Sequence, residues 1–93
     1  GNEISFIDVI EDSSENILEC MLLSERKRKM YEAIDRVLNN REKEIICRRY
    51  GLRGNREVTQ REIGKDMGIS RSYVSRIEKK ALEKLRRHIM ENE

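Results

Sequence analysis

The stretch from residue 59 to residue 87 constrains the fold most, because it holds two helical patterns separated by only three residues. Ile63 and Met67 are four positions apart and therefore share one face of a first helix. Thr59 and Glu62 have the spacing of a capping box at the start of that helix. A second, longer helix carries its apolar residues at helical spacing, at Val74, Ile77, Ala81, Leu82 and Leu85. The segment is predicted to be two helices joined by a tight turn.

The residues between the two helices, Gly68-Ile69-Ser70, have the chemistry of that turn. Gly68 allows the positive φ that ends a helix, and Ser70 is suited to cap the next one. Gly64 has no side chain at the point where two steeply crossing helices approach each other most closely. Together these positions fill the helix-turn-helix pattern. The alternative is an αα-hairpin inside a bundle.

The second helix of the pattern is strongly basic. Residues 71–87 include seven basic and two acidic side chains, a local charge of +5. The basic residues are Arg71, Arg76, Lys79, Lys80, Lys84, Arg86 and Arg87. A solvated helix face normally mixes the two signs more evenly, whereas a surplus of this size suits a major groove lined by phosphates. We therefore predict that the motif reads DNA.

The composition of the whole chain favours helices. Its 93 residues are enough for one small domain, 41% of them are charged, and none is proline. Asp12 to Glu15 has the character of a helix start, and helical spacing then continues as far as Leu38, in one helix or two nearly continuous ones. The predicted fold class is all-α: a small bundle of about four helices between about residues 24 and 88, containing the helix-turn-helix.

A further helix is predicted just before the motif. Asn39 and Glu42 have capping-box spacing for a helix over residues 41–50, and Gly51 is placed to end it. Residues 52–58 then form a loop, whose apolar end residues are expected to attach it to the core.

The start of the chain differs from the rest in charge. Residues 1–24 carry a charge of −6 without any Lys or Arg, and residues 25–93 carry +8, an asymmetry common in nucleic-acid-binding proteins. A single strand would have no partner, so residues 1–12 are predicted to be extended or disordered. We divide the chain into an acidic linker, 1–23, and a helix-turn-helix domain, 24–93. The missing initial Met suggests a fragment of a longer protein.

The remaining reactive side chains point to binding and not to catalysis. Cys20 and Cys47 lie outside any CxxC motif, and we interpret Cys47 as a small core residue. His88 falls in the last turn of the long helix, where a cation interacts favourably with the helix dipole. No catalytic set, metal-ligand spacing or phosphate loop is visible in the sequence, so we predict no enzyme, no metal and no cofactor. Without a membrane-spanning run or signal peptide, the chain is predicted to be cytoplasmic.

Two blocks of the sequence resemble the C-terminal domain, region 4, of sigma-70 family sigma factors of bacterial RNA polymerase. LNNREKEIICRRYGL at 38–52 resembles the family's first conserved helix, and TQREIGKDMGISRSYVSRIEKKALEKLR at 59–86 resembles its helix-turn-helix. The loop between them has the family's length, and the match covers about two-thirds of the chain. The segment GISRSYVSRIEKKAL at 68–82 is most similar to the sporulation sigma factors of the sigma-K and sigma-E group. Residues 1–24 would then correspond to linker region 3.2.

This resemblance implies recognition of the −35 promoter element by the start of the second motif helix. Arg71 is the main candidate base reader, because a bidentate guanidinium can bind guanine O6 and N7. Arg76 lies about one turn later and is the second candidate. Ser72, Tyr73 and Ser75 occupy variable positions that would set which sequence is read. Tyr73 has two possible roles, contact with a thymine methyl or packing on the sugar-phosphate backbone.

The resemblance also implies a set of phosphate contacts. The candidates are Arg41, Arg49, Thr59, Gln60, Arg61 and Lys80. Thr59 and Gln60 need no charge, because a helix N-terminus binds anions through its backbone N–H groups. For Arg41 and Arg49 the alternative is an ordinary solvated face.

The family docks on core RNA polymerase through the flap-tip helix of the β subunit, which implies an apolar groove between the first two domain helices. The candidate lining is Ile34, Val37, Leu38, Ile45 and Ile46, although a role in the core explains the same residues. The acidic segment, with Asp8, Glu11 and Asp12, would thread the polymerase channel. Its alternative role is a solubilising linker. Without polymerase it is predicted to be disordered or loosely packed.

Three functions from different classes compete at this stage. The first is a promoter-specificity factor that acts as a monomer on double-stranded promoter DNA together with core polymerase. The second is a stand-alone helix-turn-helix regulator, but such a protein would need a dimerisation helix that the sequence does not show. The third is an interaction module bound by an anti-sigma factor, which the basic second helix makes a secondary role.

Overall fold

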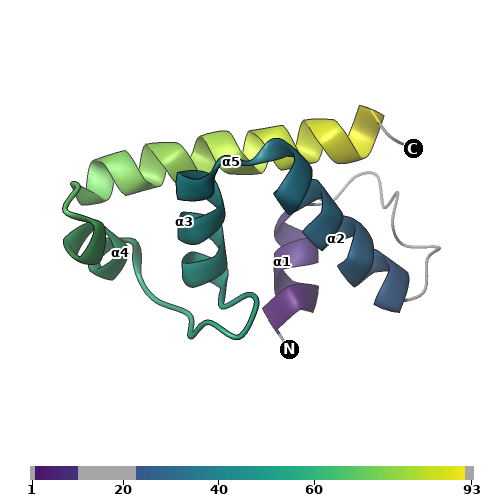
Figure 1. Cartoon of the computed structure of the whole chain (residues 1–93), viewed down its shortest axis with the longest axis horizontal. Helices are drawn as coiled ribbons and strands as arrows, with labels where there is room; N and C mark the ends of the chain where they lie inside the picture. Colours follow the sequence, from purple (N-terminus) through teal and green to yellow (C-terminus); the bar gives the residue numbers. More distant parts are fainter. Residues whose placement is uncertain (1, 11–22, 92–93) are drawn as a thin grey trace.

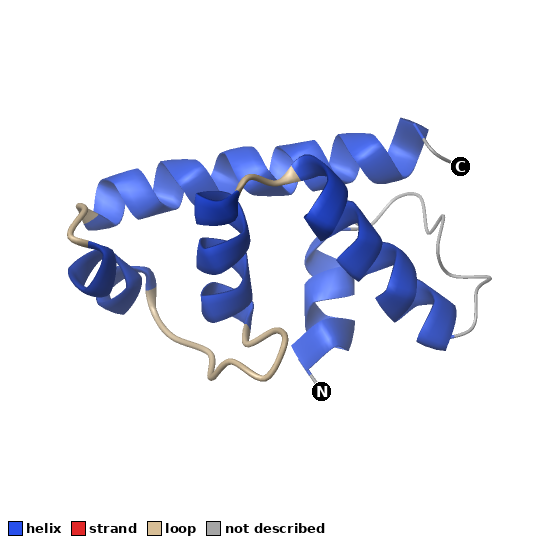
Figure 2. Cartoon of the chain, in the orientation of Figure 1, coloured by secondary structure: helices blue, strands red, loops and turns tan. Residues whose placement is uncertain are grey.

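The computed structural model describes residues 2–10 and 23–91, and all the regular structure in these two ranges is helical (Figures 1 and 2). The helices are α1 (Asn2–Ile10), α2 (Leu23–Val37), α3 (Asn40–Tyr50), α4 (Gln60–Met67) and α5 (Arg71–Glu91). The prediction of an all-α bundle is confirmed, and α2 to α5 are the four helices expected between residues 24 and 88. The predicted helix start at residues 12–15 and Cys20 lie outside the described residues.

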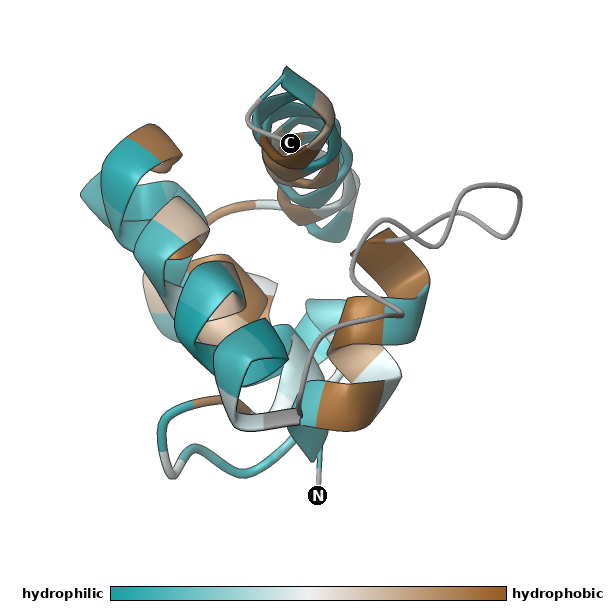
Figure 3. Cartoon of the chain, turned by 90° about the vertical axis from the view of Figure 1, so that its right-hand side faces the viewer, coloured by the Kyte–Doolittle hydropathy of each residue, from teal (hydrophilic) through white to brown (hydrophobic). Residues whose placement is uncertain are grey.

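The longest helix, α5, is the element on which the others are arranged. It runs along the top of the molecule in Figure 1 and contacts α1, α2, α3 and α4. In Figure 3 the hydrophobic ribbon is concentrated on α1 and on the lower side of α5, whereas α2 is mostly hydrophilic. The apolar face of this one amphipathic helix therefore forms one side of the whole core.

The ends of α3 are defined by the groups that the sequence predicted. The Asn39 side chain accepts a hydrogen bond from the backbone N–H of Glu42 at 2.8 Å, and Glu42 accepts one from the N–H of Asn39 at 2.9 Å. At the other end Gly51 has φ +66°, and its N–H bonds to the Cys47 carbonyl. The complete capping box and the left-handed C-terminal cap fix where α3 begins and ends.

The buried side chains form two clusters. The smaller one joins the motif to α3 through Ile45, Ile63 and Val74. The larger one joins α1, α2, α3 and α5, and its buried members include Cys47, as predicted. The loop ends also behave as predicted, because Leu52 belongs to the larger cluster and Val58 packs against the smaller one.

The prediction of an extended or disordered start is wrong for residues 2–10, which form α1. Phe6, Ile7 and Ile10 lie on one face at helical spacing, and all three are buried. The sequence argument considered only a lone strand and overlooked this spacing. A nine-residue helix is marginal by itself, so its packing against α2, α3 and α5 is what stabilises it.

Candidate nucleic-acid interface

The turn between α4 and α5 has the geometry of a helix-turn-helix. Gly68 has φ +71°, and its N–H bonds to the Gly64 carbonyl; the N–H of Ile69 bonds to the same oxygen at 2.9 Å. A Cβ at Gly64 would lie 2.7 Å from the Ile69 carbonyl oxygen, so a side chain there cannot be accommodated without a backbone shift. The predicted close approach is confirmed, although the nearest atom, the Ile69 carbonyl oxygen, belongs to the turn, and α5 contributes only the backbone N of Arg71 at 3.4 Å.

Both motif helices begin with a side-chain cap. The Ser70 hydroxyl accepts a hydrogen bond from the N–H of Tyr73 at 3.1 Å, and the Thr59 hydroxyl accepts one from the N–H of Glu62 at 3.2 Å. The second half of the Thr59 box differs from the prediction. Glu62 accepts a bond from the Thr59 hydroxyl at 3.3 Å, where the prediction had the Thr59 backbone N–H as donor. Each cap therefore satisfies one of the backbone donors at the start of its helix.

The predicted base readers are all accessible. Arg71, Ser72, Tyr73, Ser75 and Arg76 are exposed, and all five lie in the first two turns of α5, beside the turn from α4. The first turn of α5 contains no acidic residue. This end of α5 is therefore free to approach a polyanion without like-charge repulsion.

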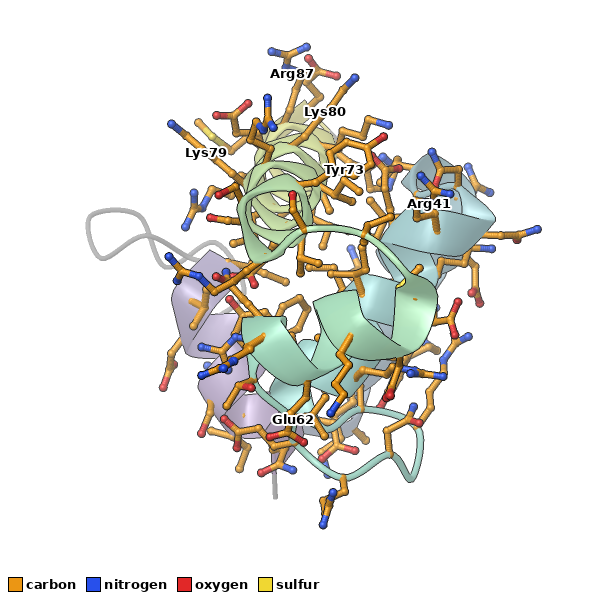
Figure 4. All side chains as sticks on the ribbon, turned by 90° about the vertical axis from the view of Figure 1, so that its left-hand side faces the viewer. Arg41, Glu62, Tyr73, Lys79, Lys80 and Arg87 are labelled. Carbon is orange, nitrogen blue, oxygen red and sulfur yellow. The ribbon has the colours of Figure 1, made fainter. Side chains whose placement is uncertain are left out.

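Tyr73 brings together two of the predicted DNA contacts. Arg41, from the first turn of α3, donates a hydrogen bond from Nη1 to the Tyr73 hydroxyl at 3.4 Å. The guanidinium carbons of Arg41 and Arg76 each lie 5.9 Å from the centroid of the Tyr73 ring, within cation–π range. Figure 4 shows Arg41 and Tyr73 on the same side of α5, with Lys80 beside them.

These side chains line a groove between the start of α3 and the outer face of α5. Its volume is about 630 Å³. The lining consists of Asn39, Asn40, Arg41, Glu42, Tyr73, Arg76, Ile77 and Lys80. Because Glu42 is buried and its charge is paired, the charges that the groove presents to solvent are cationic.

One of the two acids of the basic segment is turned into the core. Glu78 is only 9% exposed and accepts hydrogen bonds from the Tyr50 hydroxyl at 2.8 Å and from Gln60 Nε2 at 3.0 Å. Arg49 Nε lies 3.6 Å from the same carboxylate. Burial of the phenol, together with the bond to Glu78, raises the pKa of Tyr50 to about 12. This network ties α3, α4 and α5 together and removes a negative charge from the outer surface of α5.

Two of the seven bases are also directed inward. Lys84 Nζ lies 2.9 Å from Glu42, whose side chain is buried, and Arg86 donates to the Val9 carbonyl at 2.9 Å. Five bases of the segment remain exposed: Arg71, Arg76, Lys79, Lys80 and Arg87. No ion pair among the described residues involves any of the five. The outward face of α5 is thus more uniformly cationic than the composition indicates (Figure 4).

The predicted phosphate contacts divide into two groups. Arg41, Thr59, Arg61 and Lys80 are exposed. Gln60 and Arg49 belong to the Glu78 network, and Arg49 also lies 3.7 Å from Glu57 and stacks on the Tyr50 ring at 5.5 Å. In the free chain these two side chains therefore stabilise the packing of the motif.

The apolar groove predicted for polymerase docking is not exposed in the free chain. Of its five residues only Val37 is partly accessible, and the other four are at most 5% exposed. Ile45 packs on the motif helices, whereas Ile34, Leu38 and Ile46 share the larger cluster with α1. In the free chain these side chains form the core, which is the alternative that the sequence left open, and their role in polymerase docking stays a prediction.

The Glu78 network was missed at the level of sequence, although a signal for it was present. Glu78 follows Val74 by four positions and precedes Ala81 by three, so it falls on the buried stripe of α5. A carboxylate at such a position needs hydrogen-bonding partners, and Tyr50, at the end of α3, combines an apolar body with a hydroxyl that can donate.

The fold and the cationic face of α5 define a helix-turn-helix protein. Residues 36–87, more than half of the chain, match the family described as Sigma-70, region 4, and the chain belongs to this family. None of the described helices combines the length and the apolar character that crossing a membrane requires.

Several sigma factors are similar to this chain over most of its length. It is 54% identical over 85 residues to an RNA polymerase sigma-28 factor of Bacillus thuringiensis subsp. kurstaki, covering 91% of this chain and 35% of the relative. It is 52% identical over 85 residues to the RNA polymerase sigma-K factor of Bacillus subtilis, covering 91% and 29%. A Clostridium acetobutylicum sigma-E factor is 35% identical over 89 residues, covering 96% and 37%. The chain thus spans about a third of the length of the curated relatives it matches. No solved structure matches it.

Proposed function

We propose that this chain is the promoter-reading part of a sigma factor, which recognises the −35 element through its helix-turn-helix while docked on core RNA polymerase in the cytoplasm. It acts as a specificity factor and catalyses no reaction itself. The similarity to sigma-K and sigma-E factors supports sporulation genes as its targets.

The observation that carries this proposal is the outer surface of α5. Its first two turns present five exposed side chains, and its exposed bases lie outside every described ion pair. In this role Arg71 binds a guanine edge in the major groove, Arg76 reads a neighbouring position, and Ser72 and Ser75 adjust the preference.

The groove beside Tyr73 supports the placement of the DNA backbone. Arg41 and Lys80 line it from two different helices, and Tyr73 contacts Arg41 and Arg76. A phosphate strand passing along the groove would meet Arg41 and Lys80 while Arg71 enters the major groove. Because Tyr73 contacts Arg41, a candidate phosphate ligand, through its hydroxyl and its ring, packing on the sugar-phosphate backbone fits this site better than contact with a base.

The experiment that tests this proposal compares duplex binding by the chain with that of two variants, using fluorescence anisotropy on a randomised −35 region at several salt concentrations. Arg71→Ala should lose about 1–3 kcal/mol of discrimination at one base pair. Lys80→Ala should weaken all sequences alike and reduce the slope of log K against log salt by about 0.9. Arg56→Ala serves as the control, because Arg56 is exposed in the loop between α3 and α4, away from the groove.

Each outcome separates the possible functions. If Lys80→Ala leaves the salt slope unchanged, the phosphate assignment is wrong. If the chain instead binds a palindrome tightly as a dimer, it is a stand-alone regulator and the sigma-factor role fails.

A further inference from the structure

The helix α1 is packed into a groove that the other helices form. Phe6, Ile7 and Ile10 are 0%, 2% and 4% exposed, and α1 contacts α2, α3 and α5. The centroid of the Phe6 ring lies 4.8 Å from that of Tyr50. In Figure 1 α1 lies below α5, between α3 and α2, and its exposed face carries Ile4 and Asp8.

Three polar contacts fix α1 in one orientation. Asn2 Nδ2 donates to the Gly51 carbonyl at 3.3 Å, and the Tyr31 hydroxyl donates to Glu3 at 3.2 Å. At the other end of α1, Arg86 donates to the Val9 carbonyl at 2.9 Å. Buried apolar side chains along one face, with polar contacts at both ends, are how a short helix binds in a groove as a ligand.

The rest of the fold does not depend on α1 for its connections. Both α2 and α3 contact α5 directly, and the cluster that holds the motif together contains no residue of α1. Nine of the twelve buried members of the larger cluster lie outside α1, among them Met30, Ala33, Ile34, Ile46, Leu52 and Leu85. Ile34, Leu38 and Ile46, predicted from the sequence to line a docking groove, belong to this same cluster.

Several properties of α1 make it easy to displace. It has only nine residues and no basic residue in its last turn, so as an isolated helix it would be unstable. It is joined to α2 only through the chain itself, since twelve residues separate the two helices in the sequence. It therefore binds as an intramolecular ligand, whose effective concentration sets how strongly it competes with another helix.

We propose that α1 is a detachable occupant of a helix-docking groove, and that a helix of RNA polymerase displaces it when this chain docks. The displacing helix has the chemistry of α1: a short amphipathic helix with a large apolar side chain followed by aliphatic ones one and four positions later. This inference rests on the proposed docking to polymerase. It adds that the docking surface lies beneath α1, and that α1 and polymerase exclude each other.

The first test is an NMR titration of the whole chain with the isolated flap domain of the polymerase β subunit. The aromatic signals of Phe6 and the methyl signals of Ile7 and Ile10 should move to the values of a solvent-exposed segment. They should do so at the same flap concentration that saturates the shifts of Ile34 and Leu85. The signals of Ile63 in the motif should stay in place, which shows that the domain remains folded.

The second test measures flap affinity by calorimetry for Phe6→Asp, with Ile4→Asp as the matched control. Phe6→Asp cannot bury its charge and should leave the groove open, whereas Ile4 is already 43% exposed on the opposite face. If α1 is docked in about nine molecules out of ten or more, opening the groove should strengthen flap binding at least about tenfold. Ile4→Asp should bind like the parent chain.

The outcomes distinguish this inference from the proposed function. Saturable flap binding with the α1 signals unmoved, and with unchanged affinity for Phe6→Asp, would overturn the displacement of α1 and leave polymerase docking in place. No flap binding by any variant would overturn both. If Phe6→Asp proves unfolded, the titration of the parent chain decides the question alone.

Discussion

The end of the molecule that holds the helix-turn-helix and the end that holds α1 are packed by different means. In the motif a small cluster of Ile45, Ile63 and Val74 is combined with a glycine contact, two side-chain caps and a buried carboxylate network. At the other end larger side chains from α1, α2, α3 and α5 meet in one apolar cluster. The first end is defined by backbone geometry and the second by apolar burial. An interface for DNA needs fixed side-chain positions, whereas an apolar groove can exchange one helix for another.

The largest expected effect is on the α1 end. Leu85→Ala removes a fully buried side chain from the larger cluster and should lower the free energy of unfolding by about 2–5 kcal/mol. Chemical denaturation measures this, with Met90→Ala as the control, because Met90 is 58% exposed on the same helix. A cost below about 1 kcal/mol would show that apolar burial does not dominate at this end.

The next effect is on the motif. Gly64→Leu places a side chain where even a Cβ would lie 2.7 Å from the Ile69 carbonyl oxygen, and should cost about 1–3 kcal/mol through overpacking. Lys65→Leu, at the neighbouring exposed position, is the control. Thermal unfolding of the two variants gives the comparison. Equal melting temperatures would mean that the turn backbone can shift freely. They would contradict the conclusion that the motif is defined by a fixed backbone geometry.

A smaller effect distinguishes the complete capping box from the incomplete one. Asn39→Ala removes the 2.8 Å bond that its side chain accepts from the Glu42 N–H and should cost about 1–2 kcal/mol, while the Asn39 backbone N–H can still donate to Glu42. Thr59→Ala removes the longer bond of 3.2 Å from the Glu62 N–H and should cost about 0.5–1 kcal/mol. Amide exchange in the first turns of α3 and α4 reports the two losses separately. A larger loss of stability for Thr59→Ala than for Asn39→Ala would show that the Thr59 hydroxyl stabilises its helix more than its bond length indicates.

The effect that is smallest at neutral pH comes from Tyr50, because its phenol titrates only above about pH 10. The phenol titrates near pH 10.0 in the unfolded chain, and its pKa is raised to about 12 in the folded one. Between these values the unfolded chain loses the proton while the folded chain keeps it, so stability should fall as the pH rises from about 10 to 12. The free energy of unfolding is measured against pH for the parent chain and for Tyr50→Phe. The difference between the two slopes is the contribution of Tyr50. Parallel curves for the two chains would contradict the raised pKa of Tyr50, which comes first from burial of the phenol and then from its bond to Glu78.

The parts of the fold that could be predicted from the sequence are those with local causes. These causes reach only a few positions along the chain. They are a glycine that ends a helix, a Ser or Asn that caps one, and apolar residues three or four positions apart. For that reason Gly51, Gly68, Ser70 and Asn39 were placed correctly. The exposure of the proposed base readers at the start of α5 follows from the same periodicity.

The parts that could not be predicted depend on contacts between distant segments. The position of α1 depends on a groove built from residues 30 to 85, so the helix has no visible partner in its own neighbourhood. Similarly, the resemblance implied that Arg49 and Gln60 contact phosphates, but in the free chain both side chains lie beside the Glu78 carboxylate of α5. Charge counted along the sequence also overestimates how many bases face outward, since Lys84 and Arg86 are bound inside the fold.

The helix α5 belongs to both ends of the molecule, and this has a mechanical consequence. Its 21 residues form one continuous rod about 30 Å long, with the proposed base readers in its first turns and Leu85 in the larger cluster. A tilt of this rod by about 10° at the α1 end would move its first turn by about 5 Å. The proposed exchange of the helix in the groove would therefore be transmitted along a single rigid element to the proposed base readers.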